Sequence, residues 1–169
     1  HDLPVLPRGG GTSLSGQTVN HAVVVDCSSR LRSMSRIDVA HLCVDVEPGG
    51  VLDDLRAHAA RAGLTFGPEV STSSHATIAG MISNCSAGLH SRRWGMTDRH
   101  VRGVDLVLAD GTTVRLERGA ALQGDRVAEL SRRVADIVMP LSDEIDARFP
   151  RLRRNVAGYA LDRVLASIR

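Results

Sequence analysis

A glycine-rich segment near the start of the chain has the residue types of a phosphate-binding loop. The sequence GGGTSLSGQT, residues 9–18, shows the spacing G-x-x-x-x-G-Q-T from Gly11 onward. A P-loop has a lysine where this chain has Gln17, because a positive charge must reach the β- and γ-phosphates of a nucleoside triphosphate. A P-loop also leads into a helix, whereas the residues after Thr18 return to an apolar strand. We therefore expect neither an ATPase nor a GTPase site, and the glycine spacing does not match a Rossmann fingerprint.

The same segment can bind a phosphate group through its backbone instead. Three consecutive glycines allow close approach to a ligand and direct several N–H groups at it, and Thr12, Ser13 and Ser15 add hydroxyl groups. Such a neutral anion site suits a diphosphate, because nothing in it would stabilise phosphoryl transfer. A β-branched side chain at Gly10 is then expected to block the ligand while the chain stays folded. A glycine-rich turn that binds no ligand is the alternative that these residues leave open.

A second polar loop favours the hypothesis of a ligand. The segment STSSHATIAG, residues 71–80, is rich in hydroxyl groups and is followed by Asn84, Ser86 and Gly88. A solvated loop can have this composition without a function. Two donor-rich loops with apolar flanks, however, can close on one elongated polar ligand.

The sequence identifies no metal site and no catalytic base. Three cysteines lie far apart and are odd in number, which fits neither a redox pair nor a zinc or iron–sulfur ligand set: Cys27, Cys43 and Cys85. They are interpreted as buried thiols in a reducing compartment. Three histidines lie near the polar loops and are interpreted as structural or solvated residues: His75, His90 and His100.

Short strands and short helices must position the two loops. Strands are expected at 3–6, at 22–28 as a buried strand, and at 36–46 with a bulge or bend near Ala40 and His41. Helices are predicted over 51–62, where Leu52, Leu55 and Ala59 share one face before Gly63, and over 77–83.

The second half of the chain is expected to contain a hairpin and helices. The hairpin covers 101–117 and turns at Asp110-Gly111. A helical pattern over 125–148 should be kinked or split by Pro140, and a last short helix follows the basic link RFPRLRRN, which is interpreted as solvated. Because β and α segments do not alternate regularly, the predicted fold class is α+β, with a mixed or antiparallel sheet flanked by helices.

The composition excludes several classes of protein. The 169 residues carry a net charge of +2 with acidic and basic residues interleaved, and four of them are aromatic, which argues against a nucleic-acid partner. The apolar runs are far shorter than the ~20 residues of a membrane-spanning helix. The chain opens inside an expected strand, so that we expect it to be a piece of a larger protein.

Four motifs together resemble a known flavoprotein family. PVLPRGGGTSLSGQ, VEPGGVLDDL, GPEVSTSSHATIAGMISNCSAG and VDLVLADGT follow one another in the order and spacing of this family. They resemble the FAD-binding domain of the vanillyl-alcohol oxidase / p-cresol methylhydroxylase (PCMH) flavoproteins, most of all the FAD-linked oxidases of the D-lactate dehydrogenase and glycolate oxidase type. The resemblance implies a partial PCMH-type FAD-binding domain that binds FAD non-covalently.

The resemblance also implies which residues bind FAD. The glycine loop would bind the pyrophosphate through Arg8, Gly9, Gly10, Gly11, Thr12, Ser13, Gly16 and Gln17. The second loop and the short helix after it would follow the flavin, ribitol and diphosphate, with hydroxyls and helix-end donors at Pro68, Ser73, Ser74, Thr77, Gly80, Ser83 and Asn84. The chain departs from the family at Ala79 and Cys85, where Gly and Asn are usual.

The parent protein would be an FAD-linked oxidoreductase acting on a 2-hydroxy acid such as D-lactate or glycolate. Residues 1–118 would form the FAD-binding domain without its N-terminal part, and 119–169 a helical extension toward an absent substrate domain. An iron–sulfur region of the parent is a candidate partner, and the expected location is cytoplasmic or at the membrane periphery. The isolated chain is expected to be inactive. A fragment, or a phosphate- or nucleotide-binding module, that holds no flavin is the alternative.

Overall fold

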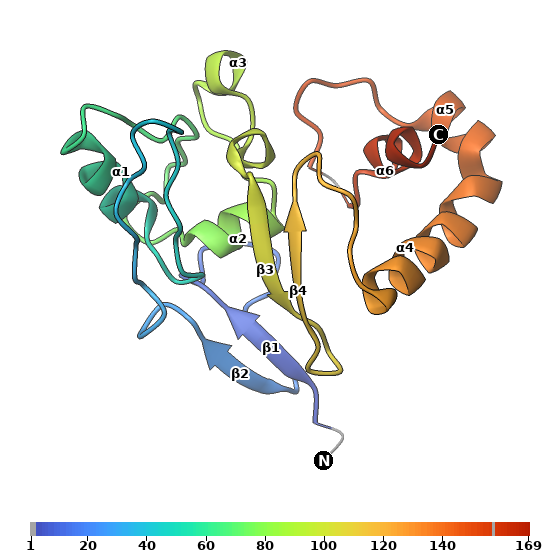
Figure 1. The fold of residues 1–169 in the computed structure, drawn as a ribbon, viewed down its shortest axis with the longest axis horizontal. Helices are drawn as coiled ribbons and strands as arrows, with labels where there is room; N and C mark the ends of the chain where they lie inside the picture. The colour runs from blue at the N-terminus through green and yellow to red at the C-terminus, as the bar shows by residue number, and fades with distance from the viewer. Residues whose placement is uncertain (1–2, 157) are drawn as a thin grey trace. The chain divides into compact units, whose positions relative to one another are not determined.

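The computed structural model describes residues 3–156 and 158–169. The chain divides into two compact units, His1–His100 and Val101–Arg169, and each is described here by itself. Elements of both units are labelled in Figure 1. None of the helices in the described ranges has the length and apolar character that crossing a bilayer requires.

The first unit begins with two strands that run side by side (Figure 1). β1 (Val5–Arg8) pairs in parallel with β2 (Val23–Asp26), in a register that joins Arg8 to Asp26. The ladder continues for one residue, since the Cys27 N–H donates to the Arg8 carbonyl at 2.9 Å. The prediction that this second strand is buried is wrong for this chain. Val23, Val24 and Val25 are 43–50% exposed, because each strand of the pair has one partner and little packs on its faces.

The strand expected over 36–46 is also wrong. The segment instead forms isolated bridges, Met34 to Val46 and Asp38 to Cys43, around a tight turn at 39–42. The Asp38 carboxylate accepts hydrogen bonds from the backbone N–H and the ring Nδ1 of His41, at 3.0 and 2.7 Å, and this local bonding reverses the chain. The turn lies where the apolar pattern slips, and the predicted bend is therefore confirmed.

Two helices form the core of the first unit. The predicted buried face of α1 (Leu52–Ala60) is confirmed, and Leu52 and Leu55 pack with Met81 of α2 (Ile78–Ser83). Full burial of a side chain such as Leu52 stabilises the fold by about 1.5–3 kcal/mol. Backbone hydrogen bonds join the starts of the two helices, from the Leu52 N–H to the Ala76 carbonyl at 3.0 Å and from the Ile78 N–H to the Gly50 carbonyl at 2.8 Å. The start of α2 is therefore held in place by the segment that leads into α1.

Two further helical turns, not anticipated in the sequence, complete this unit. They are α3 (Ser91–Trp94) and the 3-10 helix η1 (Thr97–His100). The Trp94 ring lies so close to Gly67 that a Cβ added there would be 2.9 Å from ring atoms. The Thr97 side chain is fully buried and donates to the Ser86 carbonyl at 2.7 Å.

The second unit contains the predicted hairpin and a helical region. β3 (Gly103–Val107) pairs antiparallel with β4 (Thr113–Glu117), and Gly111 in the turn has φ +84°. The predicted interruption at Pro140 is confirmed, since α4 (Asp125–Val138) passes through the 3-10 helix η2 (Met139–Leu141) into α5 (Ser142–Arg148). α6 (Leu161–Ile168) adds Leu165 to a core with Val138 and Ile145.

Candidate functional site

One cavity of about 220 Å³ lies within the first unit, between the glycine loop and α2. The parallel pair β1–β2 positions the glycine loop, because the loop leaves the end of β1 while β2 returns beside it. The contacts at the start of α1 position the other wall. The cavity is lined by Pro7, Arg8, Gly9, Gly10, Gly11, Thr12, Ser13, Gln17, Thr18, Cys27, Pro48, Ala76, Thr77, Ala79, Gly80, Met81, Ser83, Asn84 and Ser86.

Eleven of the fifteen residues expected to bind FAD line this single cavity. They are Arg8, Gly9, Gly10, Gly11, Thr12, Ser13, Gln17, Thr77, Gly80, Ser83 and Asn84. The other four lie elsewhere: Gly16 in a turn with φ +81°, Pro68 buried, and Ser73 and Ser74 on the loop before α2. Segments that are about 70 residues apart in the chain are thus brought together as the two-loop hypothesis anticipates.

Gly9 and Gly10 are required by the contact between the two loops. A Cβ added at Gly10 would lie 1.9 Å from the His75 carbonyl oxygen, and one at Gly9 would lie 2.1 Å from Thr77 Oγ1. Real Cβ atoms do not approach other atoms so closely, and one of the two colliding groups is backbone. These two glycines therefore allow one wall of the cavity to pack on the other, and a side chain at Gly10 would disturb that packing whether or not a ligand is present.

The remaining part of the glycine loop offers backbone donors. Gly11 has φ +68°, a conformation that favours glycine. The N–H groups of Gly10, Gly11 and Thr12 donate no hydrogen bond within the described parts of the chain. Ser13 Oγ donates to Gln17 Oε1 at 2.5 Å and closes the loop, which gives the uncharged Gln17 a local role. These N–H groups are therefore available to bond either to a ligand or to water.

A buried hydroxyl of the opposite wall lacks a partner. Thr77 is 2% exposed, and its Oγ1 makes no hydrogen bond within residues 3–156 and 158–169. A buried polar group without a hydrogen bond costs about 1–3 kcal/mol, so such an atom is rare in a site that needs no ligand. Thr77 Oγ1 lies at the contact with Gly9 and beside Gly80, both of which line the cavity, so this unsatisfied hydroxyl is part of the wall where the two loops meet.

Arg8 is the one basic side chain among the lining residues. Its Nη2 donates to Asp26 Oδ2 at 2.6 Å, while its Nε is buried without a partner in the described parts of the chain. Hydrogen bonds from the Ser28 hydroxyl and backbone N–H, and then the Arg8 guanidinium, hold the pKa of Asp26 below its ordinary value. An ionised Asp26 therefore keeps Arg8 beside the glycine loop.

The expected helix-end donors of α2 are not all available. The Ile78 N–H donates to the Gly50 carbonyl at 2.8 Å and the Ala79 N–H to the Pro48 carbonyl at 3.2 Å. Ser83 Oγ donates back to the Ala79 carbonyl at 2.9 Å. The Ile78 and Ala79 N–H groups at the start of the helix are thus not free to bind an anion, whereas the N–H groups of Gly10, Gly11 and Thr12 have no partner in the described residues.

Sequence reasoning missed several lining residues, of which Cys27 is the most distinctive chemically. A parallel pairing of 5–8 with 23–26 would have placed it beside Gly9, but two short apolar runs do not reveal their register. The other missed residues are Pro7, Thr18, Pro48, Ala76, Ala79, Met81 and Ser86. Most of these side chains are apolar and carry no chemical signal in the sequence, whereas Ser86 is recognisable only as part of a polar segment.

The three histidines near the loops have local partners. His75 Nδ1 lies 2.8 Å from Ser74 Oγ, and His100 Nε2 lies 2.7 Å from the Trp94 carbonyl. His90 Nδ1 lies 2.5 Å from Glu69 Oε2, and this hydrogen bond lowers the pKa of Glu69. None of the three belongs to the residues that line the cavity, and the cavity as described contains no histidine that could act as a base.

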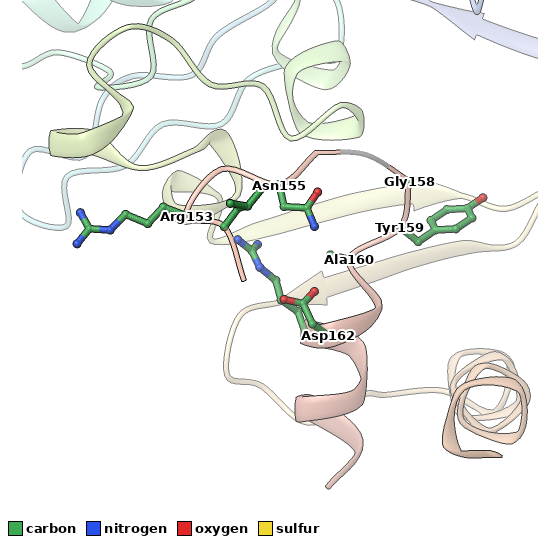
Figure 2. Close-up of a pocket in the computed structure, with 8 residues that line it drawn as sticks. Arg153, Asn155, Gly158, Tyr159, Ala160 and Asp162 are labelled. Carbon is green, nitrogen blue, oxygen red and sulfur yellow. The ribbon is translucent and has the colours of Figure 1, made fainter. Parts of the chain in front are cut away.

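A second, much smaller pocket lies in the second unit, on the segment before α6 (Figure 2). Its volume is about 30 Å³, roughly that of one water molecule. The side chains of Arg153 and Tyr159 extend away from it in opposite directions (Figure 2). The basic link therefore forms no ligand-sized cavity in the described residues of this unit.

Comparisons with known proteins agree on one family. A family model described as FAD binding domain matches residues 1–117. D-2-hydroxyglutarate dehydrogenase of Pseudomonas putida is 37% identical over 167 residues, which are 94% of this chain and 16% of that protein. The glycolate oxidase subunit GlcD of Bacillus subtilis is 33% identical over 116 residues, which are 68% of this chain and 25% of that protein. The chain thus spans a quarter or less of the length of these curated relatives.

A solved structure shows the same fold. Alkyldihydroxyacetonephosphate synthase superposes on 73% of this chain and 24% of its own, with a TM-score of 0.62 and 21% sequence identity. This likeness, together with the family match to residues 1–117, confirms the α+β fold of FAD-binding type that the four motifs predict.

Proposed function

The chain belongs to the FAD binding domain family, and from this membership we propose that it is the FAD-binding portion of an oxidoreductase that oxidises a 2-hydroxy acid. The family match supports the cofactor, and the substrates in the names of the two relatives, D-2-hydroxyglutarate and glycolate, share the 2-hydroxy acid group. FAD would supply the redox chemistry, because its flavin ring accepts a hydride equivalent. This chain's own residues bind and orient the cofactor.

The cavity between the two loops is proposed to hold the diphosphate end of FAD. The N–H groups of Gly10, Gly11 and Thr12 would donate to phosphate oxygens, and the Arg8 guanidinium would lie near the negative charge. Gly9 keeps Thr77 close to these donors. A cavity of about 220 Å³ holds part of a cofactor as large as FAD, so that the flavin ring would extend beyond it.

The observation that carries this proposal is the unpartnered Thr77 hydroxyl. It is buried in a residue that lines the same cavity as Gly10, Gly11 and Thr12, whose N–H groups have no partner in the described residues. Without a ligand, the buried hydroxyl bears this cost without compensation, whereas the N–H groups of the exposed Gly10 and Gly11 can bond to water. A ligand with several acceptor oxygens satisfies them together.

The test compares two buried threonines by FAD titration of the 169-residue chain. Wild-type chain should quench FAD fluorescence and retain absorbance near ~450 nm after desalting. Thr77→Val should weaken FAD binding by roughly tenfold, because one hydrogen bond to the ligand is lost. The matched control is Thr97→Val, whose hydroxyl already bonds to the Ser86 carbonyl and which does not line the cavity. Its affinity for FAD should stay within about twofold of wild type.

A wild-type chain that binds no FAD would refute the proposal. Equal losses in both variants would refute the role of Thr77. Riboflavin serves as a second probe: it lacks the diphosphate and should bind far more weakly than FAD. ADP bound as tightly as FAD would favour a nucleotide-binding module without flavin.

The remaining proposals concern the parent protein. We propose that 1–118 is its FAD-binding portion and that 119–169 leads toward a substrate domain, with an iron–sulfur region as a further partner. The 169-residue chain should then not oxidise a panel of D- and L-2-hydroxy acids with an artificial electron acceptor, because the substrate must be held against the flavin with a base in reach. A cytoplasmic location is proposed because no disulfide joins the three cysteines, which fits a reducing compartment.

A further inference from the structure

A cysteine is among the residues that line the proposed cofactor cavity. Cys27 lines this cavity, whereas Cys43 and Cys85 are not among its lining residues. All three cysteines are half-buried and none forms a disulfide in the described parts of the chain. The ladder between β1 and β2 determines this position, because the Cys27 N–H bonds to the Arg8 carbonyl at 2.9 Å, immediately before Gly9.

Packing constrains the Cys27 backbone more than its thiol. A Cβ added at Gly49 would lie 2.0 Å from the Cys27 carbonyl oxygen, and the Leu31 N–H donates to the same oxygen at 3.1 Å. The Sγ atom makes one long contact, 3.8 Å to the Val25 carbonyl. A thiol is a weak donor, and this contact costs little to lose. The backbone can therefore stay in place while the sulfur reacts.

A feature that does not depend on Cys27, the unpartnered Thr77 hydroxyl, indicates that this cavity holds a ligand. The fully buried Thr77 hydroxyl on the opposite wall lacks a partner among the described residues, and so do the N–H groups of Gly10 and Gly11. The whole cavity measures about 220 Å³. A tripeptide-sized group attached at Sγ would occupy the volume that a diphosphate needs.

We propose that Cys27 is a site of reversible thiol modification that excludes FAD from the cavity. The proposal rests on the FAD-binding function inferred above. The reactant is a low-molecular-weight disulfide: the Cys27 thiolate attacks one of its sulfurs, a mixed disulfide forms, and the other half leaves as a thiol. The flavin takes no part in this exchange. Reduction of the mixed disulfide restores the cavity, so that cofactor loading follows the thiol redox state.

The first experiment measures protection. The chain is treated with iodoacetamide with and without saturating FAD, and the alkylation rate at each cysteine is determined by peptide mass spectrometry. FAD should slow alkylation of Cys27 by roughly tenfold or more and leave Cys43 and Cys85 within about twofold. Equal rates at Cys27 with and without FAD would overturn the proposal.

The second experiment measures exclusion. Chain carrying a glutathione mixed disulfide at Cys27 should bind FAD at least about tenfold more weakly, and dithiothreitol should restore binding. The FAD affinity of Cys27→Ser should be the same before and after treatment with glutathione disulfide, while Cys43→Ser should keep the sensitivity. FAD binding that survives complete modification of Cys27 would overturn this proposal alone. Failure of the unmodified wild-type chain to bind FAD would instead remove the function on which the proposal rests.

Discussion

The two ends of α2 differ in how completely their polar groups are satisfied. At the start, Thr77 is 2% exposed with an unpartnered hydroxyl, and Gly9 approaches it so closely that no side chain fits. Past the end, Thr97 is 0% exposed, and both its N–H and its hydroxyl donate to the Ser86 carbonyl, at 2.9 and 2.7 Å. The first unit thus contains two buried threonines, one with an unpartnered hydroxyl and one whose hydroxyl is hydrogen-bonded.

The end of α2 is closed by its own backbone. The Ser86 N–H donates to the Met81 carbonyl at 2.8 Å and the Cys85 N–H to the Ile82 carbonyl at 3.0 Å, which is the Schellman pattern. The start is completed only in part, since the Thr77 hydroxyl has no partner in the described residues. The Met81 and Ile82 carbonyls at the end of α2 have partners within the chain, whereas the unpartnered hydroxyl at the start is consistent with the ligand proposed above.

The largest expected effect is at Gly10. Gly10→Ala places a methyl group against the His75 carbonyl oxygen, and overpacking of this kind costs about 1–3 kcal/mol. The free energy of unfolding and FAD binding should therefore fall together, which corrects the expectation that a side chain here would act on the ligand alone. Chemical denaturation and FAD titration check this.

Gly16→Ala is the control for this prediction, since an added Cβ there meets no atom within 4 Å in the described residues. It should cost about 1 kcal/mol for its positive φ and keep FAD affinity. A Gly10→Ala chain as stable as wild type would contradict the close approach of the two loops.

The next expected effect is a difference in the free energy of unfolding between Thr77→Val and Thr97→Val, measured without ligand. Thr97→Val loses a hydrogen bond and should destabilise the chain by about 1 kcal/mol. Thr77→Val removes a buried hydroxyl that has no bond to lose, so the stability of the ligand-free chain should stay the same or rise by up to about 1 kcal/mol. Urea denaturation without FAD measures both. If Thr77→Val destabilised the chain as much as Thr97→Val, the Thr77 hydroxyl would have a hydrogen-bond partner, and the two ends of α2 would not differ in this respect.

A smaller gain is expected at the closed end. Cys85 has φ +46°, in the left-handed region that favours glycine or asparagine at this position of a Schellman motif. Cys85→Asn should raise the free energy of unfolding by about 0.5 kcal/mol, because relief of the backbone exceeds the loss of the contact between Sγ and Asp98 Oδ1 at 3.3 Å. FAD affinity should not change, since Cys85 does not line the cavity. A loss of stability would mean that the Asp98 contact outweighs the backbone.

The smallest expected effect is a pH dependence of stability at Asp26, which pairs with Arg8 beside the glycine loop. The pKa of Asp26 is lowered from its ordinary value of 3.8, first by the Ser28 hydroxyl. A carboxyl whose folded pKa is depressed contributes stability above its unfolded pKa, and this contribution disappears as the pH falls through the folded value. Below about pH 4 the wild-type chain should lose thermal stability more steeply than Asp26→Asn. Ser28→Ala should remove part of the difference, and identical pH profiles for wild type and Asp26→Asn would exclude a role for this carboxylate.

Much of the local structure follows from the sequence alone. The periodic apolar residues of 51–62, the Asp110-Gly111 turn and the break at Pro140 act through neighbours in the chain, and each appears as expected. The same holds for the identity of the glycine loop, because the absence of a lysine and of a following helix excludes a P-loop on local grounds. The strand expected over 36–46 does not form, because a hydrogen-bonded turn at Asp38 competes with strand pairing.

The tertiary structure alone decided what surrounds the cavity. The register of two four-residue strands places Cys27 beside the glycine loop, and apolar runs do not encode a register when both faces are exposed. Whether a threonine hydroxyl finds a partner depends on which backbone segment packs against it, and Thr77 and Thr97 cannot be told apart by residue type. Close approach of Gly10 to His75 likewise joins residues 65 positions apart, so that no local pattern contains it.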